Sequence, residues 1–177
     1  MKKIFLAFII VFSSNSYGLD KSYINQLEEN LQNYTFQIQT KSGLAQKYFD
    51  YAMLYLHGFN DNEAYLWFEK ASKEDPDCVM CYFGLALSLN NEIMEEGDEK
   101  MKQAAKFIDQ GLKKATEGSK EHELLKALEK RYSQGKISTI DKRNMAYADA
   151  LKLLFRKYSN DAEIAVLYAK SLMDTST

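Results

Sequence analysis

Residues 46–55 read QKYFDYAMLY and residues 80–89 read MCYFGLALSL, and the two stretches share one pattern of bulky and small side chains. Four positions recur 34 residues later, in the pairs Tyr48 and Tyr82, Tyr51 and Leu85, Ala52 and Ala86, and Tyr55 and Leu89. Steps of three and four residues place these side chains on one face of a helix. The recurrence therefore predicts an all-α fold that is built from a repeated unit.

The segment between the two stretches completes that unit. Asn60, with Glu63 three residues later, resembles a capping box that opens a second helix, and Gly58 marks the end of the first. Two helices joined by so short a turn pack antiparallel. The buried face predicted for the second helix consists of Ala64, Leu66, Trp67, Phe68 and Ala71, and the Asp75-Pro76 pair follows it.

This order of side chains and its period of 34 residues resemble the tetratricopeptide repeat family. The likeness covers roughly residues 44–177, and residues 78–86, CVMCYFGLA, are similar to those of a group of exported bacterial members. The resemblance implies a right-handed superhelix of antiparallel helix pairs. It also implies a concave groove, lined by the first helix of each pair, that binds a protein or peptide, with no enzymatic activity and no cofactor.

Residues 1–18 are predicted to be a signal peptide, because Lys2-Lys3 precedes an apolar run from Ile4 to Phe12 and Gly18 ends the stretch. We expect an exported protein, periplasmic or secreted. No transmembrane segment is expected in the mature chain, since a spanning helix needs roughly 20 apolar residues.

Residues 19–43 are predicted to form a leading amphipathic helix and a connector. The helix, over residues 22–34, would carry Ile24, Leu27, Leu31 and Tyr34 on one face. In the connector, Phe36 and Ile38 alternate with Gln37 and Gln39, a pattern that favours extended backbone.

Residues 44–177 are predicted to contain three helix pairs, at about 44–74, 76–116 and 119–158, and an unpaired helix at 161–174. Asp75 is expected to cap the second pair, whose second helix carries Ala104, Ile108 and Gly111. The third pair has the apolar stripes Leu124, Leu125, Leu128 and Tyr132, then Met145, Ala148, Leu151, Phe155 and Tyr158. In the last helix, Tyr168-Ala169 and Leu172 repeat the spacing of Tyr51-Ala52 and Tyr55. An unpaired helix exposes an apolar face, so we expect this chain to be the front part of a longer repeat protein or to have its end covered by a partner.

The resemblance places a ligand groove on the first helices of the first two pairs. Its expected residues are Gln46, Phe49, Met53, Leu56, His57, Met80, Phe83, Leu87, Asn90 and Asn91. Six of these ten are apolar, which favours an apolar or amphipathic ligand, helical or extended. The alternative is that the chain covers its own groove with the leading helix.

Cys78 and Cys81 are the only cysteines. Their spacing permits a structural disulfide, two packed thiols, or a redox or metal site, and all three readings stay open. Glu74, Asp75 and Asp77 oppose thiolate formation, and no further metal ligand lies within reach, so we expect no bound metal. An exported thiol-redox or metal-handling protein is nevertheless the alternative function.

The remaining composition argues against two classes of function. The formal net charge is −2 and the basic residues are scattered, whereas nucleic-acid binding depends on clustered Lys and Arg. No phosphate loop, nucleophile elbow or zinc-binding helix motif is present, and the isolated His122 is expected to be solvated. The predicted function is therefore a binding scaffold rather than an enzyme.

Overall fold

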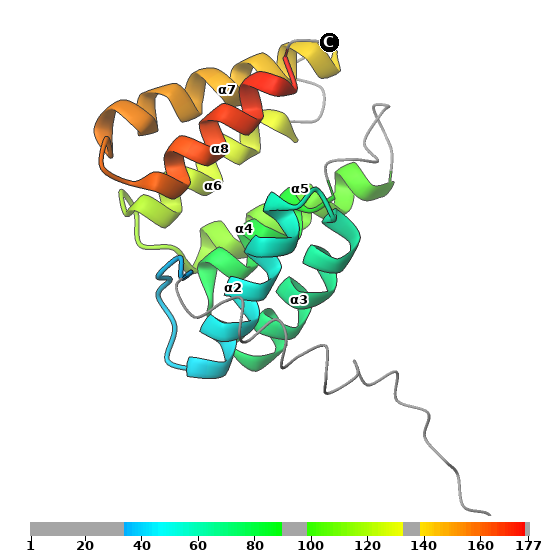
Figure 1. Ribbon diagram of the computed structural model, residues 1–177. Coiled ribbons are helices and arrows are strands. Elements are labelled where there is room, and N and C mark those ends of the chain that lie inside the picture. The colour runs from blue at the N-terminus through cyan, green and yellow to red at the C-terminus, as the bar shows by residue number, and fades with distance from the viewer. Residues whose placement is uncertain (1–33, 90–98, 133–138, 176–177) are drawn as a thin grey trace, which may run out of the picture. The chain divides into compact units, whose positions relative to one another are not determined.

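The computed structural model describes residues 34–89, 99–132 and 139–175, and all of its secondary structure there is helical (Figure 1). The helices form three successive pairs and a final single helix, which confirms the predicted all-α, repeat-like fold. In chain order they are α2 (Gly43–His57), α3 (Asp61–Glu74), α4 (Val79–Leu87), α5 (Glu99–Lys114), α6 (Lys120–Arg131), α7 (Ile140–Lys157) and α8 (Ala162–Met173). The predicted signal peptide and leading helix lie outside the described residues.

The first pair, α2 and α3, forms a hairpin around large aromatic side chains. Tyr48 and Tyr51 both contact the Trp67 ring, with ring centroids 5.5 and 4.9 Å away. Ala52 and Ala64 are fully buried, as expected for small residues that let the two backbones approach closely. Leu66, which was predicted to be buried, is 49% exposed because it points away from α2.

The turn between α2 and α3 confirms the predicted helix start. The Asn60 side chain accepts a hydrogen bond from the Glu63 backbone N–H and so caps α3. The left-handed backbone that often ends a helix falls on Phe59, with φ of 59°, and not on Gly58. This conformation is costly for a residue with a large side chain.

The second pair begins three residues later than predicted. Asp75 ends α3, and the backbone N–H of Cys78 donates to the Asp75 carbonyl across a turn. The sulfur of Cys78 then caps α4 by accepting from the Cys81 N–H. Asp75 therefore does not cap α4, because the Asp-Pro pair is used in the turn that precedes it. Within α4, a Cβ at Gly84 would lie 2.3 Å from the Phe68 ring, so α3 and α4 require glycine at this contact.

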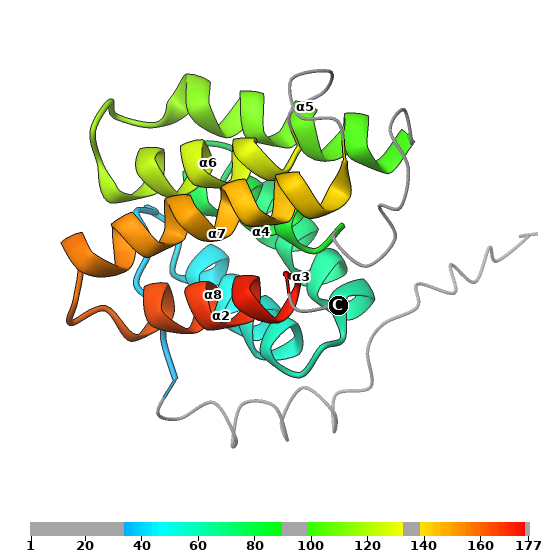
Figure 2. The ribbon, with the colours of Figure 1, turned by 90° about the horizontal axis from the view of Figure 1, so that it is seen from above.

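The last three helices pack in sequence, with α7 against both α6 and α8 (Figure 2). The predicted stripe of α6 is buried throughout, from Leu124 to Tyr132. In α7 the buried face is displaced from the predicted one: Tyr147, Ala148, Leu151 and Leu154 are buried, whereas Met145 is 57% exposed. The prediction for Met145 was wrong because α7 turns a neighbouring face, which includes Asn144, toward the core.

Residues 34–40 precede α2 and contain neither helix nor strand. Phe36 and Ile38 are buried, whereas the residues that alternate with them, Thr35, Gln37 and Gln39, are exposed. The alternation predicted for the connector is thus confirmed, because side chains of an extended segment point to opposite sides in turn. We refer to residues 34–40 as the extended segment.

Candidate functional site

Most of the predicted groove residues that the structure describes are buried within the chain. Six of them are between 0% and 3% exposed: Phe49, Met53, Leu56, Met80, Phe83 and Leu87. Gln46 and His57 are partly exposed, and Asn90 and Asn91 lie outside the described residues. Whether these residues bind a ligand stays a prediction, but in the structure their positions are occupied by the chain itself. We call the surface formed by Gln46, Phe49, Asp50 and His57 of α2 the groove surface.

The extended segment lies along the groove surface and runs antiparallel to α2. At its start, the Tyr34 hydroxyl lies 3.3 Å from Nε2 of His57, at the end of α2. At its other end, Thr40 lies beside Ser42, which caps the start of α2. The segment therefore spans the whole length of the helix, as a bound peptide would.

Two side chains of α2 bind the main chain of the extended segment. The backbone N–H of Phe36 donates to Oδ1 of Asp50 (3.0 Å), and Nε2 of Gln46 donates to the Phe36 carbonyl (2.9 Å). The backbone N–H of Ile38 donates to Oε1 of Gln46 (3.1 Å). Gln46 and Asp50 also bond each other, at 3.0 Å, so the two side chains hold one another in place. These bonds satisfy main-chain groups that burial would otherwise leave unpaired.

The next contacts of the extended segment come from α6 and from the end of α3. The Gln39 backbone N–H donates to Oε1 of Glu121 (3.1 Å), and the Thr40 hydroxyl donates to Oδ2 of Asp75 (2.5 Å). Glu121 is 82 residues from Gln39 in the sequence. The binding surface for the segment is therefore assembled from separate repeats rather than from α2 alone.

The apolar side chains of the segment enter an aromatic cluster. The Phe36 ring packs on Phe49, with centroids 5.8 Å apart, and Phe49 packs in turn on Phe68 of α3. On the other side, Nζ of Lys120 lies 5.3 Å from the centre of the Phe36 ring, close enough for a cation–π interaction. Burial of this aromatic side chain supplies the apolar part of the binding energy.

The carboxylates that bind the extended segment differ in the direction of their pKa shifts. Burial raises the pKa of Asp50, although the hydrogen bonds from Phe36, Thr35 and Gln46 oppose the shift. Burial likewise raises the pKa of Glu121. At the exposed end, the hydrogen bond from Thr40 lowers the pKa of Asp75. The pKa shifts of Asp50 and Glu121 thus have the opposite sign to the shift of Asp75.

A second polar contact joins the segment to α8. Nε2 of His57 lies 3.1 Å from Oε2 of Glu163 in the first turn of α8, and the Tyr34 hydroxyl is within hydrogen-bond distance of the same nitrogen. Burial raises the pKa of Tyr34, and the nearby Glu163 carboxylate adds to that effect. The Tyr34 hydroxyl is therefore uncharged at physiological pH.

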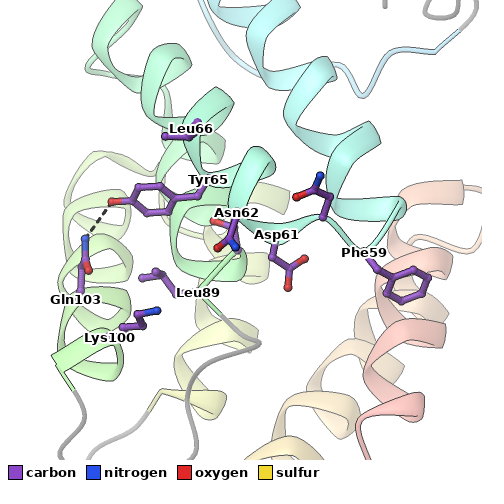
Figure 3. Close-up of a pocket in the computed structure, with 10 residues that line it drawn as sticks. Phe59, Asp61, Asn62, Tyr65, Leu66, Leu89, Lys100 and Gln103 are labelled. Atoms are coloured by element: carbon purple, nitrogen blue, oxygen red, sulfur yellow. Dashed lines mark hydrogen bonds between the residues drawn. The ribbon is translucent and has the colours of Figure 1, made fainter. Parts of the chain in front are cut away.

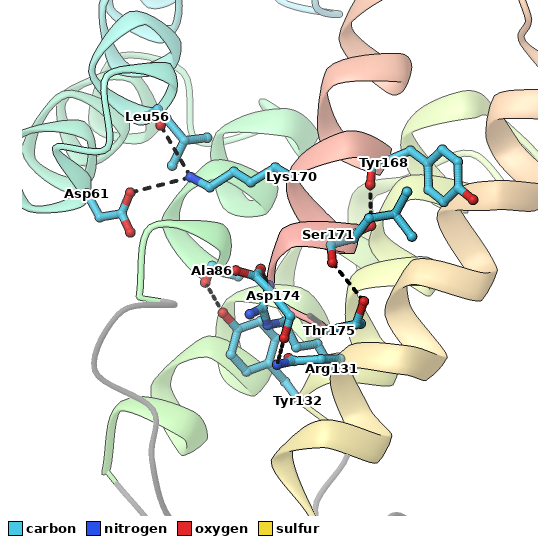
Figure 4. A network of polar contacts seen from close by, with 12 residues as sticks. Leu56, Asp61, Ala86, Arg131, Tyr132, Tyr168, Lys170, Ser171, Asp174 and Thr175 are labelled. Atoms are coloured by element: carbon cyan, nitrogen blue, oxygen red, sulfur yellow. Dashed lines mark hydrogen bonds and ion pairs between the residues drawn. The ribbon is translucent and has the colours of Figure 1, made fainter. Parts of the chain in front are cut away.

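The inner side of α8 is tied to the first pair by a cluster of charged side chains (Figure 4). Nζ of Lys170 donates to the Leu56 carbonyl at 3.3 Å and lies 3.7 Å from Oδ1 of Asp61. Arg131 of α6 forms an ion pair with Asp174 at 2.9 Å. Arg131, Lys170 and Asp174 help to line a cavity of about 10 Å³. The cluster connects α8 with the first pair and with α6.

A larger pocket, of about 760 Å³, lies on another part of the molecule (Figure 3). It is formed where the start of α3, the end of α4 and the start of α5 meet. One wall is fixed by a hydrogen bond of 3.0 Å from Nε2 of Gln103 to the Tyr65 hydroxyl. Its lining residues are Phe59, Asn60, Asp61, Asn62, Tyr65, Leu66, Ser88, Leu89, Lys100 and Gln103. They combine one carboxylate, one ammonium group, amides and scattered apolar groups, and contain no nucleophile paired with a base.

The two cysteines form a disulfide, with their Cα atoms 5.4 Å apart. The structure therefore contains a disulfide and not two packed thiols. Both cysteines are fully buried at the start of α4. An attacking thiolate must reach a disulfide sulfur directly, so this burial opposes thiol exchange.

Within the described residues, no group of three or more His, Cys, Asp and Glu side chains is placed to hold a metal ion. Among the helices in the same ranges, none has the length and apolar character to cross a membrane. His122 is partly buried, and its ring nitrogen Nδ1 lies 3.5 Å from the Gly118 backbone nitrogen.

Comparison with known proteins gives no match: no family model, no curated protein and no solved structure is similar to this chain. The tetratricopeptide resemblance therefore stays a prediction.

Sequence reasoning located most of the groove surface but missed two of the acids that bind the segment, Asp50 and Glu121. A signal for Asp50 was present, because it is the one acidic residue in the otherwise uncharged stretch FDYAML of α2. No comparable signal marks Glu121, whose role depends on the contact between α6 and Gln39 of the extended segment.

Proposed function

We propose that this protein is an exported, tetratricopeptide-like scaffold that binds an extended peptide segment of a partner protein at the groove surface. The observation that carries the proposal is the extended segment itself, which is bound there through its main chain by Gln46, Asp50 and Glu121. A partner peptide would take its place. The protein then acts by holding a partner and not by transforming it.

The contacts of the extended segment define the class of ligand. Main-chain bonds do not depend on the identity of a side chain, whereas the pockets for alternate side chains select what enters. The two buried positions hold Phe36 and Ile38, and the residue between them is exposed. The ligand class is therefore an uncharged, extended peptide with an aromatic residue and an aliphatic residue two positions apart.

The tethered segment sets the affinity that a partner can reach. It is joined to α2 by only two residues, Lys41 and Ser42, so it competes at a high effective concentration. An external peptide binds only the fraction of molecules in which the segment has left the surface, and its apparent dissociation constant rises accordingly. Weakening the segment should thus strengthen external binding.

The test uses the chain from residue 19 onward and a labelled peptide, YTFQIQT, that copies residues 34–40. The double variant Phe36→Ser, Ile38→Ser removes the apolar anchors of the segment and leaves the groove surface intact. By fluorescence anisotropy, we expect it to bind the peptide at least about 10-fold more tightly than the wild type. Adding Gln46→Ala to this variant should abolish the gain, because Gln46 makes two of the main-chain bonds.

A matched control replaces the exposed, remote Leu66 by Ser and should leave peptide binding unchanged. Circular dichroism verifies that each variant is folded. In the wild type, saturating peptide should speed amide exchange at Phe36 and Ile38, since the displaced segment loses its hydrogen bonds. Equal peptide binding by wild-type and opened chains, with unchanged amide exchange, would refute the proposal.

The competing function is thiol-redox or metal chemistry at Cys78 and Cys81. It predicts that the double variant Cys78→Ser, Cys81→Ser loses its activity, whereas the scaffold function predicts that a folded double variant binds the peptide as the wild type does. Titration of free thiols after brief reduction, with and without urea, also distinguishes a redox-active disulfide from a structural one. A disulfide that is reduced only in urea is structural.

The proposed export rests on the Lys2-Lys3 and Ile4–Phe12 pattern and is supported by the disulfide, because such bonds persist in oxidising compartments. We place the protein in the periplasm or outside the cell. Detection of a mature chain that begins near Leu19 in the exported fraction would test this.

A further inference from the structure

The first turn of α6 contacts the extended segment through two consecutive side chains. Nζ of Lys120 lies 5.3 Å from the centre of the Phe36 ring, and Oε1 of Glu121 accepts the Gln39 backbone N–H. The bond to Glu121 is made with the main chain and is therefore compatible with many peptide sequences. The contact from Lys120 is made with a side chain, so it can distinguish one residue type from another at position 36.

The Phe36 ring contacts both an aromatic ring and this ammonium group. Phe36 is 5% exposed, and its ring packs on Phe49 with centroids 5.8 Å apart and an angle of 57° between the ring planes. A cation near the face of an aromatic ring is attracted by the ring quadrupole, and an aromatic pair adds an attraction of its own. An aliphatic side chain in this place would bury apolar area but would gain neither attraction.

A carboxylate at the start of α8 holds Lys120 in this position. Nζ of Lys120 donates to Oδ2 of Asp161 at 2.8 Å, and the Asp161 side chain is 20% exposed. The other oxygen of Asp161 accepts the Ile164 backbone N–H and caps α8, so the carboxylate is itself fixed by the helix. The ammonium group therefore has a defined place beside the Phe36 ring.

The same ion pair opposes an acidic residue at position 36. A free ammonium group would attract a carboxylate, but the partner of Lys120 is already Asp161. A second carboxylate would be repelled by Asp161 and would have to be buried beside the Phe49 ring, which is 0% exposed. The surroundings of position 36 thus favour a neutral side chain that has a ring face to offer.

We propose that Lys120, positioned by Asp161, is a specificity-determining residue that selects peptides with a neutral aromatic side chain in the place of Phe36, over aliphatic and acidic ones. This inference rests on the proposed peptide function. It adds a selection that the main-chain bonds from Gln46 and Asp50 do not make.

A double-mutant cycle within the chain tests the contact without any peptide. Phe36→Leu and Lys120→Gln are made singly and together, and urea unfolding gives the unfolding equilibrium constant of each chain. We expect Phe36→Leu to raise this constant about 2- to 5-fold more in the wild-type background than in the Lys120→Gln background. The control Lys126→Gln removes the same charge from α6, where Lys126 pairs with Glu129, and should show no coupling to Phe36→Leu. A Lys120 coupling no larger than that of the control would overturn the inference.

Peptide binding tests the selection itself. The chain opened by Phe36→Ser and Ile38→Ser is titrated with YTFQIQT and with YTLQIQT, which differ only at the position of Phe36. We expect YTFQIQT to bind about 10-fold more tightly, and this preference to fall to about 3-fold when Lys120→Gln is added. A peptide with trifluorophenylalanine in that position should bind more weakly than YTFQIQT only where Lys120 is present, because fluorine withdraws electron density from the ring face.

The role of Asp161 is tested by Asp161→Asn, which keeps a good helix cap and removes the ion pair. We expect this variant of the opened chain to bind YTEQIQT more tightly than the opened chain alone does, since Lys120 can then pair with the glutamate. Unchanged binding of YTEQIQT would show that Asp161 does not position Lys120.

The inference and the proposed function fail separately. Equal preference for YTFQIQT over YTLQIQT with and without Lys120 would overturn the inference and leave the peptide function standing. Absence of binding by every peptide would overturn the peptide function, whereas the double-mutant cycle would still report whether Lys120 recognises the Phe36 ring.

Discussion

The groove surface and the exposed face of α8 lie on helices that share the repeat pattern, yet the first is covered and the second is not. The exposed face of α8, which we call the α8 face, consists of Ala162, Val166, Ala169 and Met173. The groove surface is covered by residues 34–40, whose main chain finds donors and acceptors on Gln46 and Asp50. The α8 face has no such cover within the described residues. Repetition of a helix pattern therefore produces apolar surfaces at regular places, and the non-repeating parts of the chain decide which of them remain available.

The largest difference between the two surfaces should appear when one apolar anchor of each is truncated. Phe36→Ala removes a ring that is 5% exposed and should lower the free energy of unfolding by about 3–5 kcal/mol. Met173→Ala, at a side chain that is 60% exposed, should change it by no more than about 0.5 kcal/mol. Urea unfolding measures both. Equal costs would mean that the extended segment is not part of the packed core.

Equivalent alanines should respond differently to enlargement. Ala52→Leu overpacks the contact between α2 and α3 and should cost about 1–3 kcal/mol. Ala169→Leu adds a side chain at an exposed position and should change the stability by less than about 0.5 kcal/mol. Thermal unfolding at low protein concentration compares the two. A large cost at position 169 would show that the α8 face is covered within one chain.

The hydrogen bonds from the groove surface to the main chain of the extended segment can be removed without changing the apolar contacts. Gln46→Ala leaves the Ile38 N–H and the Phe36 carbonyl without these partners and should cost about 1 kcal/mol or slightly more. Gln37→Ala, at an exposed amide beside it, serves as the control and should cost less. Hydrogen exchange supplies the second measurement, with faster exchange expected at Ile38 only in the Gln46 variant.

The smallest predicted effect concerns the pH dependence of stability that arises from Asp50 and Asp75, the carboxylates that bind the extended segment at Phe36 and at Thr40. The pKa of Asp50 is raised by burial, so its favourable contribution to folding is present below pH 3.8 and is lost as the pH rises through its folded pKa. The pKa of Asp75 is lowered by the bond from Thr40, so its contribution is present above pH 3.8 and is lost as the pH falls through its folded pKa. Carboxyl NMR titration should place the two on opposite sides of 3.8. The free energies of unfolding of the Asp75→Asn variant and of the wild type should therefore become more similar as the pH is lowered.

The sequence predicted the helices well because their apolar spacing and caps are local. Asn60 marks the start of α3, and the alternation of Phe36 and Ile38 identifies an extended segment, since each signal depends on neighbours within four residues. The start of α4 was predicted too early because Asp75-Pro76 resembles a cap, although it forms a turn here. The exposure of Met145 was missed because Ala148 and Leu151 fit either of two neighbouring faces of α7, and only packing selects between these faces.

Local sequence patterns could not show that the candidate site is covered by another part of the chain. Register within the repeat predicted Phe49, Met53 and Met80 as groove residues, but register does not show that they are buried within the chain. That outcome depends on Gln39 meeting Glu121 and on Lys170 meeting Leu56, across 82 and 114 residues. Such contacts have no signature in a single sequence.

The bonds from α8 back to the first pair have a consequence for how this chain folds. Repeat arrays whose units touch only their neighbours can lose structure from one end while the other end persists. Here Lys170 and Glu163 complete the polar contacts of Leu56 and His57, which lie 114 and 106 residues earlier, so α2 depends on α8 for these contacts. The described helices should therefore melt in one cooperative transition, and a newly made chain should stay vulnerable to proteases until α8 has emerged.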